Sequence, residues 1–87
     1  MGNQSKRPKH LAAKLRAIRH GLKLSQSQLL KRLDRRNLSY TRISEYETGA
    51  RVPSMITVLA YAKVARVRVE ILIDDKLSLP ERFKPKP

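Results

Sequence analysis

The chain has 87 residues and carries 20 Lys and Arg against 7 Asp and Glu, which gives a net charge of +13. A chain of this length forms one small domain at most, and because its core buries little surface, help from a second subunit is expected. The absence of cysteine excludes disulfides, thiolate metal sites and a cysteine nucleophile. No apolar run approaches the roughly 20 residues that span a bilayer, and no signal peptide is recognisable, so we expect a cytoplasmic protein.

The positive charge is concentrated in the N-terminal half. Residues 1–42 hold 12 Lys and Arg and a single acid, Asp34, whereas residues 43–87 hold 8 bases and 6 acids. The two parts therefore carry +11 and +2. Such a field concentrates a polyanion at one end of a small domain, and a short exposed helix at that end is a natural reader of nucleic acid.

Residues 1–10 are polar and basic, and because they show no apolar periodicity we expect them to form a flexible arm. The first helix is predicted to begin at Leu11, since apolar residues recur from there at the spacing of one buried helix face, and Gly21 helps to end it. Its buried stripe comprises Leu11, Leu15, Ile18 and Leu22.

A capping box indicates where the second helix begins. The Ser25 hydroxyl can accept the amide of Gln28, and the Gln28 side chain can reach back to the Ser25 amide. A charged segment, residues 34–38, contains a turn-forming Asn37 and connects this helix to the third. The residues that the second helix is expected to bury are Leu29, Leu30 and Leu33.

The third helix has little to bury. Ser39 or Thr41 is expected to cap it, and Gly49 can adopt the left-handed conformation that ends it. Between these ends, only Ile43 and Tyr46 share an apolar face. A helix with so narrow an apolar face needs neighbours to hold it, and most of its side chains are left to point outward.

The fourth helix, residues 54–65, is apolar on more than one side. One stripe, Met55, Val58, Ala62 and Ala65, is expected to serve the core. A second stripe is a candidate dimer surface, together with apolar residues of a short fifth helix over residues 69–74. The residues of this candidate surface are Ile56, Leu59, Ile71 and Ile73.

The sequence pattern is less definite near the C-terminus. The alternation at residues 67–69 leaves a short strand as the alternative to the start of the fifth helix. Residues 76–87 show no helical periodicity, so we expect an irregular tail that contains Pro and Lys.

These elements resemble the Cro/repressor-like helix-turn-helix family, also called XRE-like. The resemblance spans residues 11–73 and is carried by the Ser25-Gln26 cap, the Ile43-Ser44, Tyr46-Glu47 and Gly49 run, and the Pro53-Ser54 restart. It implies an all-α fold, a compact five-helix lambda-repressor-like DNA-binding domain over residues 11–75, whose third helix enters the major groove. The chain departs from the family pattern in a longer turn before Ser39 and in Arg66, which stands where glycine is common.

If the third helix lies in the groove, side chains near its N-terminus and one turn later reach base edges. Thr41 can hydrogen-bond a base or press its methyl group on thymine, Tyr40 can use its ring or hydroxyl, and Glu45 can accept from cytosine. Pairing of Glu45 with Arg42 is the alternative, because phosphates repel a carboxylate. The predicted base-reading residues are Tyr40, Thr41, Ser44 and Glu45.

Contacts to the DNA backbone need only charge, amides and position. Gln26 lies at the N-terminus of the second helix, where free amides and the helix dipole favour a phosphate, and the resemblance implies the same role. The other predicted backbone contacts are Ser39, Arg42 and Arg51 around the third helix, Arg35 and Arg36 in the turn before it, and Lys6, Arg7 and Lys9 in the arm.

The resemblance also implies a shielded ion pair between Arg19 of the first helix and Glu47 of the third. A guanidinium and a carboxylate can pair through two parallel hydrogen bonds, which gives orientation as well as attraction. The pair is expected to fix the reading helix on its support.

The sequence thus predicts a sequence-specific regulator of transcription, most simply a dimeric repressor that binds double-stranded DNA at an inverted repeat. The alternative is an antitoxin that binds a toxin protein and represses its own operon, and a third interpretation is nonspecific, charge-driven coating of nucleic acid. An enzyme fits poorly, since His10 and His20 have no cysteine or acidic cluster with which to build a triad or metal site. No cofactor, metal or membrane association is predicted.

Overall fold

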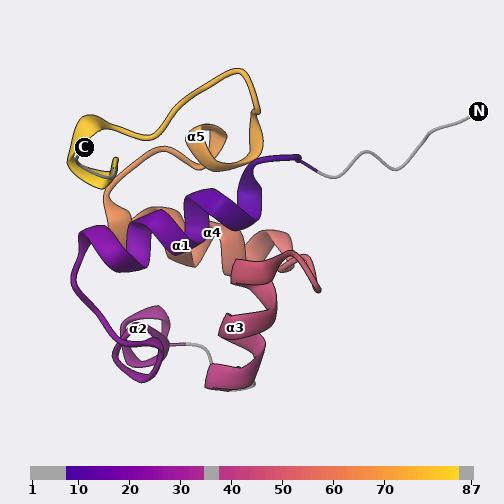
Figure 1. Ribbon diagram of the computed structural model, residues 1–87, viewed down its shortest axis with the longest axis vertical. Helices are drawn as coiled ribbons and strands as arrows, with labels where there is room; N and C mark the ends of the chain where they lie inside the picture. Colours follow the sequence, from indigo (N-terminus) through magenta and orange to yellow (C-terminus); the bar gives the residue numbers. More distant parts are fainter. Residues whose placement is uncertain (1–7, 35–37, 85–87) are drawn as a thin grey trace, which may run out of the picture.

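The computed structural model describes residues 8–34 and 38–84 of the chain. Helices α1 and α4 cross the middle of the molecule, with α2 and α3 on one side and α5 on the other (Figure 1). No described residue lies in a strand, so the predicted all-α class is confirmed and the strand alternative at residues 67–69 is wrong. The helices are α1 (Leu11–Gly21), α2 (Gln26–Leu33), α3 (Tyr40–Thr48), α4 (Met55–Ala65), α5 (Val69–Ile73) and the 3-10 helix η1 (Glu81–Phe83).

Every α-helix contributes at least one fully buried large side chain to a single core. Burying a side chain of this size stabilises the fold by about 1.5–3 kcal/mol, so each short helix is held mainly by what it packs against. The predicted stripe of α1 is confirmed except that Leu22 is only half-buried, as is Leu30 of α2. The fully buried residues include Leu15, Ile18, Leu29, Ile43, Tyr61 and Leu72.

The core stripe of α4 differs from the predicted one at its first residue. Val58, Ala62 and Ala65 are buried as expected, but Met55 is 61% exposed, and Tyr61 is buried in the middle of the same face. Met55 lies roughly a quarter turn from the centre of that face at 100° per residue, and it begins the helix, where the backbone leaves the core. Met55 therefore joins the exposed apolar surface of α4.

Side-chain caps fix where three helices begin. The Ser25 Oγ accepts the amide of Gln28 at 3.1 Å while the Gln28 Oε1 accepts the amide of Ser25 at 2.8 Å, which is the predicted capping box. Ser39, and not Thr41, caps α3 by accepting the amide of Arg42 at 3.3 Å. Ser54 caps α4 in the same way. These bonds satisfy amides that have no partner within the helix.

Left-handed residues end three of the helices. Asp34 ends α2 with φ of 53°, Gly49 ends α3 with φ of 83°, as predicted, and Arg66 ends α4 with φ of 60°. A side chain in this region costs about 1–2 kcal/mol relative to glycine, so Arg66 is locally strained. The strain is tolerated where Arg82 donates from Nη2 to the Ala65 carbonyl at 2.7 Å, because this bond satisfies an end carbonyl of α4.

Residues 75–84, here called the C-terminal segment, pack across α1 and contribute to the core. Leu79 and Phe83 are buried, although the sequence pattern indicated only an irregular tail here. Gly21 permits this close approach, because a Cβ at that position would stand 2.7 Å from Cδ1 of Phe83. The glycine therefore matters for packing, whereas the left-handed residue after α1 is Lys23 with φ of 60°.

A buried lysine joins α1 to the end of α5. Lys14 is only 7% exposed, and its Nζ donates to the carbonyls of Ile71 at 2.7 Å, Leu77 at 2.8 Å and Asp74 at 3.0 Å. An ammonium group has three protons, and each has an acceptor here. Lys14 thus gives the end carbonyl of Ile71 a partner and ties α1 to the chain that follows α5.

Asp75 makes the reciprocal bond to the start of α1. Its carboxylate accepts the amides of Lys9 at 2.8 Å and His10 at 3.1 Å, and these hydrogen bonds lower the pKa of Asp75 from its ordinary value. His10, the residue before α1, provides no side-chain cap for the helix. Helix α1 and the chain from Ile71 to Leu77 are therefore joined by hydrogen bonds in both directions.

Replacing Lys14 by methionine should destabilise the domain, because three carbonyls lose their charged donor while the apolar stem remains. We expect the free energy of unfolding to fall by about 3 kcal/mol. Urea denaturation followed by circular dichroism measures it. The matched control is Arg16→Met, two residues along the same helix at an exposed position, which should leave the midpoint nearly unchanged. Equal midpoints for the two variants would contradict the role given to Lys14.

Candidate nucleic-acid interface

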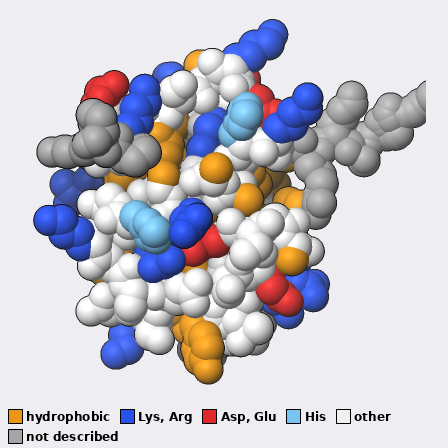
Figure 2. All heavy atoms as spheres, in the orientation of Figure 1, with side chains coloured by type: hydrophobic (Ala, Val, Ile, Leu, Met, Phe, Trp, Pro, Cys, Tyr) orange, Lys and Arg blue, Asp and Glu red, His pale blue; other side chains and the backbone are white. Residues whose placement is uncertain are grey.

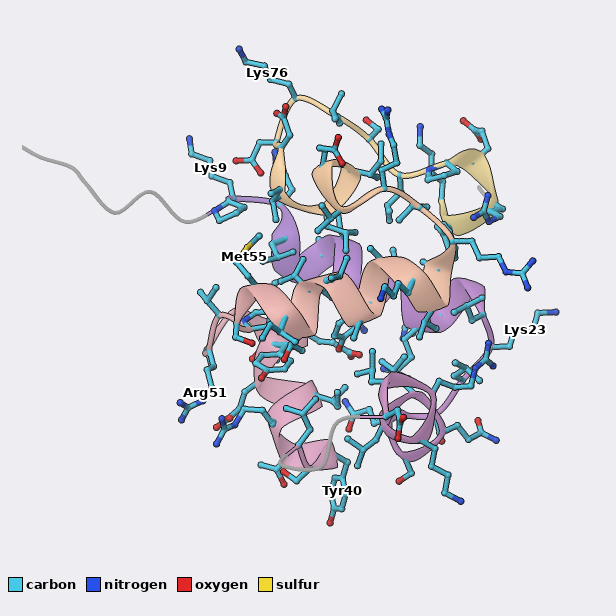
Figure 3. All side chains as sticks on the ribbon, turned by 180° about the vertical axis from the view of Figure 1, so that it is seen from behind. Lys9, Lys23, Tyr40, Arg51, Met55 and Lys76 are labelled. Atoms are coloured by element: carbon cyan, nitrogen blue, oxygen red, sulfur yellow. The ribbon has the colours of Figure 1, made fainter. Side chains whose placement is uncertain are left out.

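Helix α3 lies at the edge of the molecule with its N-terminus outermost. Tyr40 begins the helix and Arg51 follows its C-terminal end, and both side chains point away from the body of the protein (Figure 3). Ile43 and Tyr46 lie on the opposite, buried face. The helix therefore presents one polar face along its whole length.

The four predicted base-reading residues lie on that outward face. Tyr40, Thr41, Ser44 and Glu45 occupy i, i+1, i+4 and i+5 positions, which fall on one side of a helix. Tyr40 is 60% exposed and Thr41 is exposed, whereas Ser44 and Glu45 are half-buried. Hydroxyl, ring and carboxylate groups thus lie side by side on the surface of α3.

Glu45 lies between two arginines. Its Oε1 is 3.2 Å from Nε of Arg42 and 3.1 Å from Nε of Arg51, so the pairing with Arg42 that competes with base reading is present. All three side chains are at least one third exposed, and exposed pairs of this kind contribute less than about 1 kcal/mol. Glu45 accordingly holds the two guanidinium groups beside α3, and the side chains of Arg42 and Arg51 remain 42% and 52% exposed.

The start of α2 offers a second contact of a different kind. Gln26 is the first residue of the helix, and the capping box occupies the amide of Gln28. The amides of Gln26 and Ser27 precede it, at the positive end of the helix dipole, where an anion is favoured. The arrangement suits a phosphate without requiring any particular base.

The other predicted backbone contacts fall into two groups. Ser39 caps α3 through its hydroxyl, and Lys9 is exposed with its amide bound to Asp75. Lys6, Arg7, Arg35 and Arg36 lie outside the described residues.

The ion pair between Arg19 and Glu47 fixes α3 against its neighbours. Nε of Arg19 donates to Oε2 of Glu47 at 2.6 Å and Nη2 donates to Oε1 at 2.9 Å, so the two groups meet in a parallel fork. Nη1 donates to the carbonyl of Leu24 at 3.0 Å, immediately before the cap of α2. One side chain of α1 therefore holds both α3 and the start of α2.

The pair is largely withdrawn from water. The Arg19 and Glu47 side chains are 15% and 5% exposed, and the hydrogen bonds to Glu47 raise the pKa of Arg19 above its ordinary value. Tyr61 is buried in the same region, and burial raises the pKa of its hydroxyl well above the usual range. Its hydroxyl has no hydrogen-bond partner among the described residues. The sequence did not single out Tyr61, because a tyrosine among the apolar residues of α4 looks like any other core residue.

Within residues 8–34 and 38–84, no group of three or more His, Asp or Glu side chains could hold a metal ion. None of the helices in this part of the chain has the length and apolar character needed to cross a membrane.

Comparison with protein families matches the helix-turn-helix domain over residues 10–71, which is most of the chain. The protein therefore belongs to the helix-turn-helix domain family, in agreement with the resemblance carried by its sequence, and its function class is that of a DNA-binding regulator. Comparison with curated proteins gives no significant match. Comparison with solved structures gives none either.

Replacing Glu47 by alanine should destabilise the domain rather than remove a DNA contact. The change leaves the guanidinium of Arg19 shielded and without its anion, so we expect a loss of about 3 kcal/mol in the free energy of unfolding. Thermal melting measures it. Glu81→Ala, at a carboxylate whose side chain is 90% exposed, is the control and should leave the melting temperature unchanged. A melting temperature of Glu47→Ala equal to that of the control would show that the pair does not hold α3.

Proposed function

We propose that this protein is a sequence-specific regulator of transcription, a repressor that acts in the cytoplasm by binding double-stranded DNA and not by catalysis. The observation that supports the proposal is the outward face of α3, with Tyr40 and Thr41 at its exposed end and the buried Arg19–Glu47 pair behind it. A recognition helix needs both features, because its polar side chains must reach base edges and the helix itself must be held rigidly in position.

In this proposal the two helices divide the work. The N-terminus of α2, with Gln26, binds one phosphate, and Arg42 and Arg51 bind others beside α3. These contacts set the depth and register of α3 in the major groove. Thr41 and Tyr40 then reach base edges, with Ser44 one turn further along the helix.

Glu45 has a different partner in the free protein and in the DNA complex. Its carboxylate accepts from both arginines in the free protein, and the bonds are exposed enough to exchange for phosphate when DNA arrives. Glu45 is then available to accept from a cytosine amino group. The charge of two arginines beside it offsets the repulsion between its carboxylate and the phosphates.

Thr41→Ala and Arg51→Ala should separate base reading from backbone binding. Thr41→Ala is expected to cost about 1–3 kcal/mol on the preferred duplex and to relax the preference at one base pair. Arg51→Ala should weaken binding to preferred and scrambled duplexes alike and reduce the salt slope by about 0.9. Fluorescence anisotropy over a salt series measures both. Lys63→Ala, at an exposed position of α4, is the control. Equal loss on preferred and scrambled duplexes for Thr41→Ala would refute its base-reading role.

Helix α4 provides the surface that we propose for dimerisation. Ile56 is 63% exposed and Leu59 is 43% exposed, and Met55 lies beside them. Ile71 and Ile73 of α5 are half-buried and pack partly against the core. Exposed apolar side chains of this number favour a partner, and a second copy would set two α3 helices about 34 Å apart on the duplex. A toxin protein is the other occupant that this surface suits.

Selection of bound duplexes from a random pool tests the function as a whole. The purified full chain should enrich an inverted repeat whose half-sites lie about one helical turn apart. The molar mass of the protein alone and on its selected duplex is then measured by light scattering, with Ile56→Glu as the variant that should prevent dimerisation. A pool without any consensus would reject sequence-specific binding. A small protein that co-purifies and occupies the α4 surface would favour the antitoxin alternative.

A further inference from the structure

A long open groove lies between α1 and the C-terminal segment. It has a volume of about 1080 Å³. Ala13, Ala17 and Gly21, four residues apart on α1, line it with small side chains, and Leu77 and Leu79 line it from the C-terminal segment. Figure 2 shows the face of the molecule that is seen in Figure 1, and on it orange apolar side chains lie between blue basic ones. The groove is therefore apolar within and basic along its edges.

The charge of the groove is one-sided. Lys9, Arg16 and Arg82 line it together with His10 and His20. The two acids that line it are already engaged, since Glu47 binds Arg19 and Asp75 binds two backbone amides. Within the described residues, neither Lys9 nor Arg16 forms an ion pair. A ligand that brings carboxylates would meet cations that lack a counter-charge.

We propose that this groove binds an acidic segment of a partner protein, in which small or apolar side chains lie against Ala13 and Ala17 and carboxylates face Arg16 and its basic neighbours. Helix α1 has 11 residues and is therefore about 16 Å long, which is the length of about five residues of extended chain. Small side chains in the helix let a backbone approach closely, and the cations give the partner its orientation.

The apolar lining favours a protein segment over nucleic acid. A sugar-phosphate backbone has charge for the edges of the groove but few apolar groups for Leu77 and Leu79. The position of the groove points the same way. Lys9, at the N-terminal end of α1, lies at the opposite end of the molecule from Tyr40 (Figure 3). A partner in the groove can therefore be bound while α3 occupies DNA, which is how a regulator would contact other proteins on a promoter.

Selection from random seven-residue peptides displayed on phage, with the full chain as bait, tests the proposal. The most enriched sequence is then made as a fluorescent peptide, and its dissociation constant is measured by anisotropy. Arg16→Glu reverses the charge at the edge, and Ala13→Trp fills the exposed floor. Lys63→Glu is the matched charge reversal outside the groove. Each variant is checked by thermal melting and by binding to a DNA duplex, so that a failure here is distinct from a failure of DNA binding.

The enriched peptides should combine at least two acids with small or apolar residues. Arg16→Glu and Ala13→Trp should each weaken the peptide about tenfold or more, while Lys63→Glu leaves it within about twofold. Neutral or basic consensus peptides, no enrichment, or equal effects of all three substitutions would overturn the proposal. It is also overturned if Arg16→Glu weakens duplex binding by the same factor as peptide binding, since the groove would then be a nucleic-acid surface. Should Arg16→Glu lower the melting temperature, Arg16→Ala replaces it under the same criteria.

Discussion

The position of α3 depends on one shielded ion pair. This helix buries only Ile43 and Tyr46 through its own apolar face, which is too narrow a contact to fix its rotation against α1. Arg19 and Glu47 supply the missing constraint, because a fork of two hydrogen bonds has a defined plane and direction. The third bond of the guanidinium, to Leu24, places the start of α2 in the same frame. The polar face of α3 can then vary in residue type without loosening the helix.

The features that sequence reasoning predicted are mostly local. The capping box of α2, the stripe of α1 and the left-handed Gly49 depend on residues within one or two turns of each other, so their spacing is visible in the chain itself. Met55 was misassigned because apolar character alone does not say where a helix leaves the core. The outward face of α3 was predicted in the same way, from the few apolar residues that it contains.

The features that were missed join distant parts of the chain. Lys14 binds carbonyls 57 to 63 residues further on, and Asp75 binds amides more than 60 residues back. A lysine on a helix has the pattern of a solvated side chain, and nothing near it in the sequence indicates three acceptors. The packing of Phe83 on Gly21 is hidden for the same reason, since both residues have ordinary local interpretations. These contacts turn an irregular segment into one wall of a groove.

Lys14 also has a chemical consequence. All three protons of its ammonium group point at carbonyl oxygens inside the protein, so the nitrogen is closed to acylating reagents that attack amines. Exposed lysines such as Lys23 and Lys76 have no such shelter (Figure 3). Modification of Lys14 requires residues 71–77 to move away from α1, so slow labelling of Lys14 relative to the exposed lysines would measure the rate of that opening.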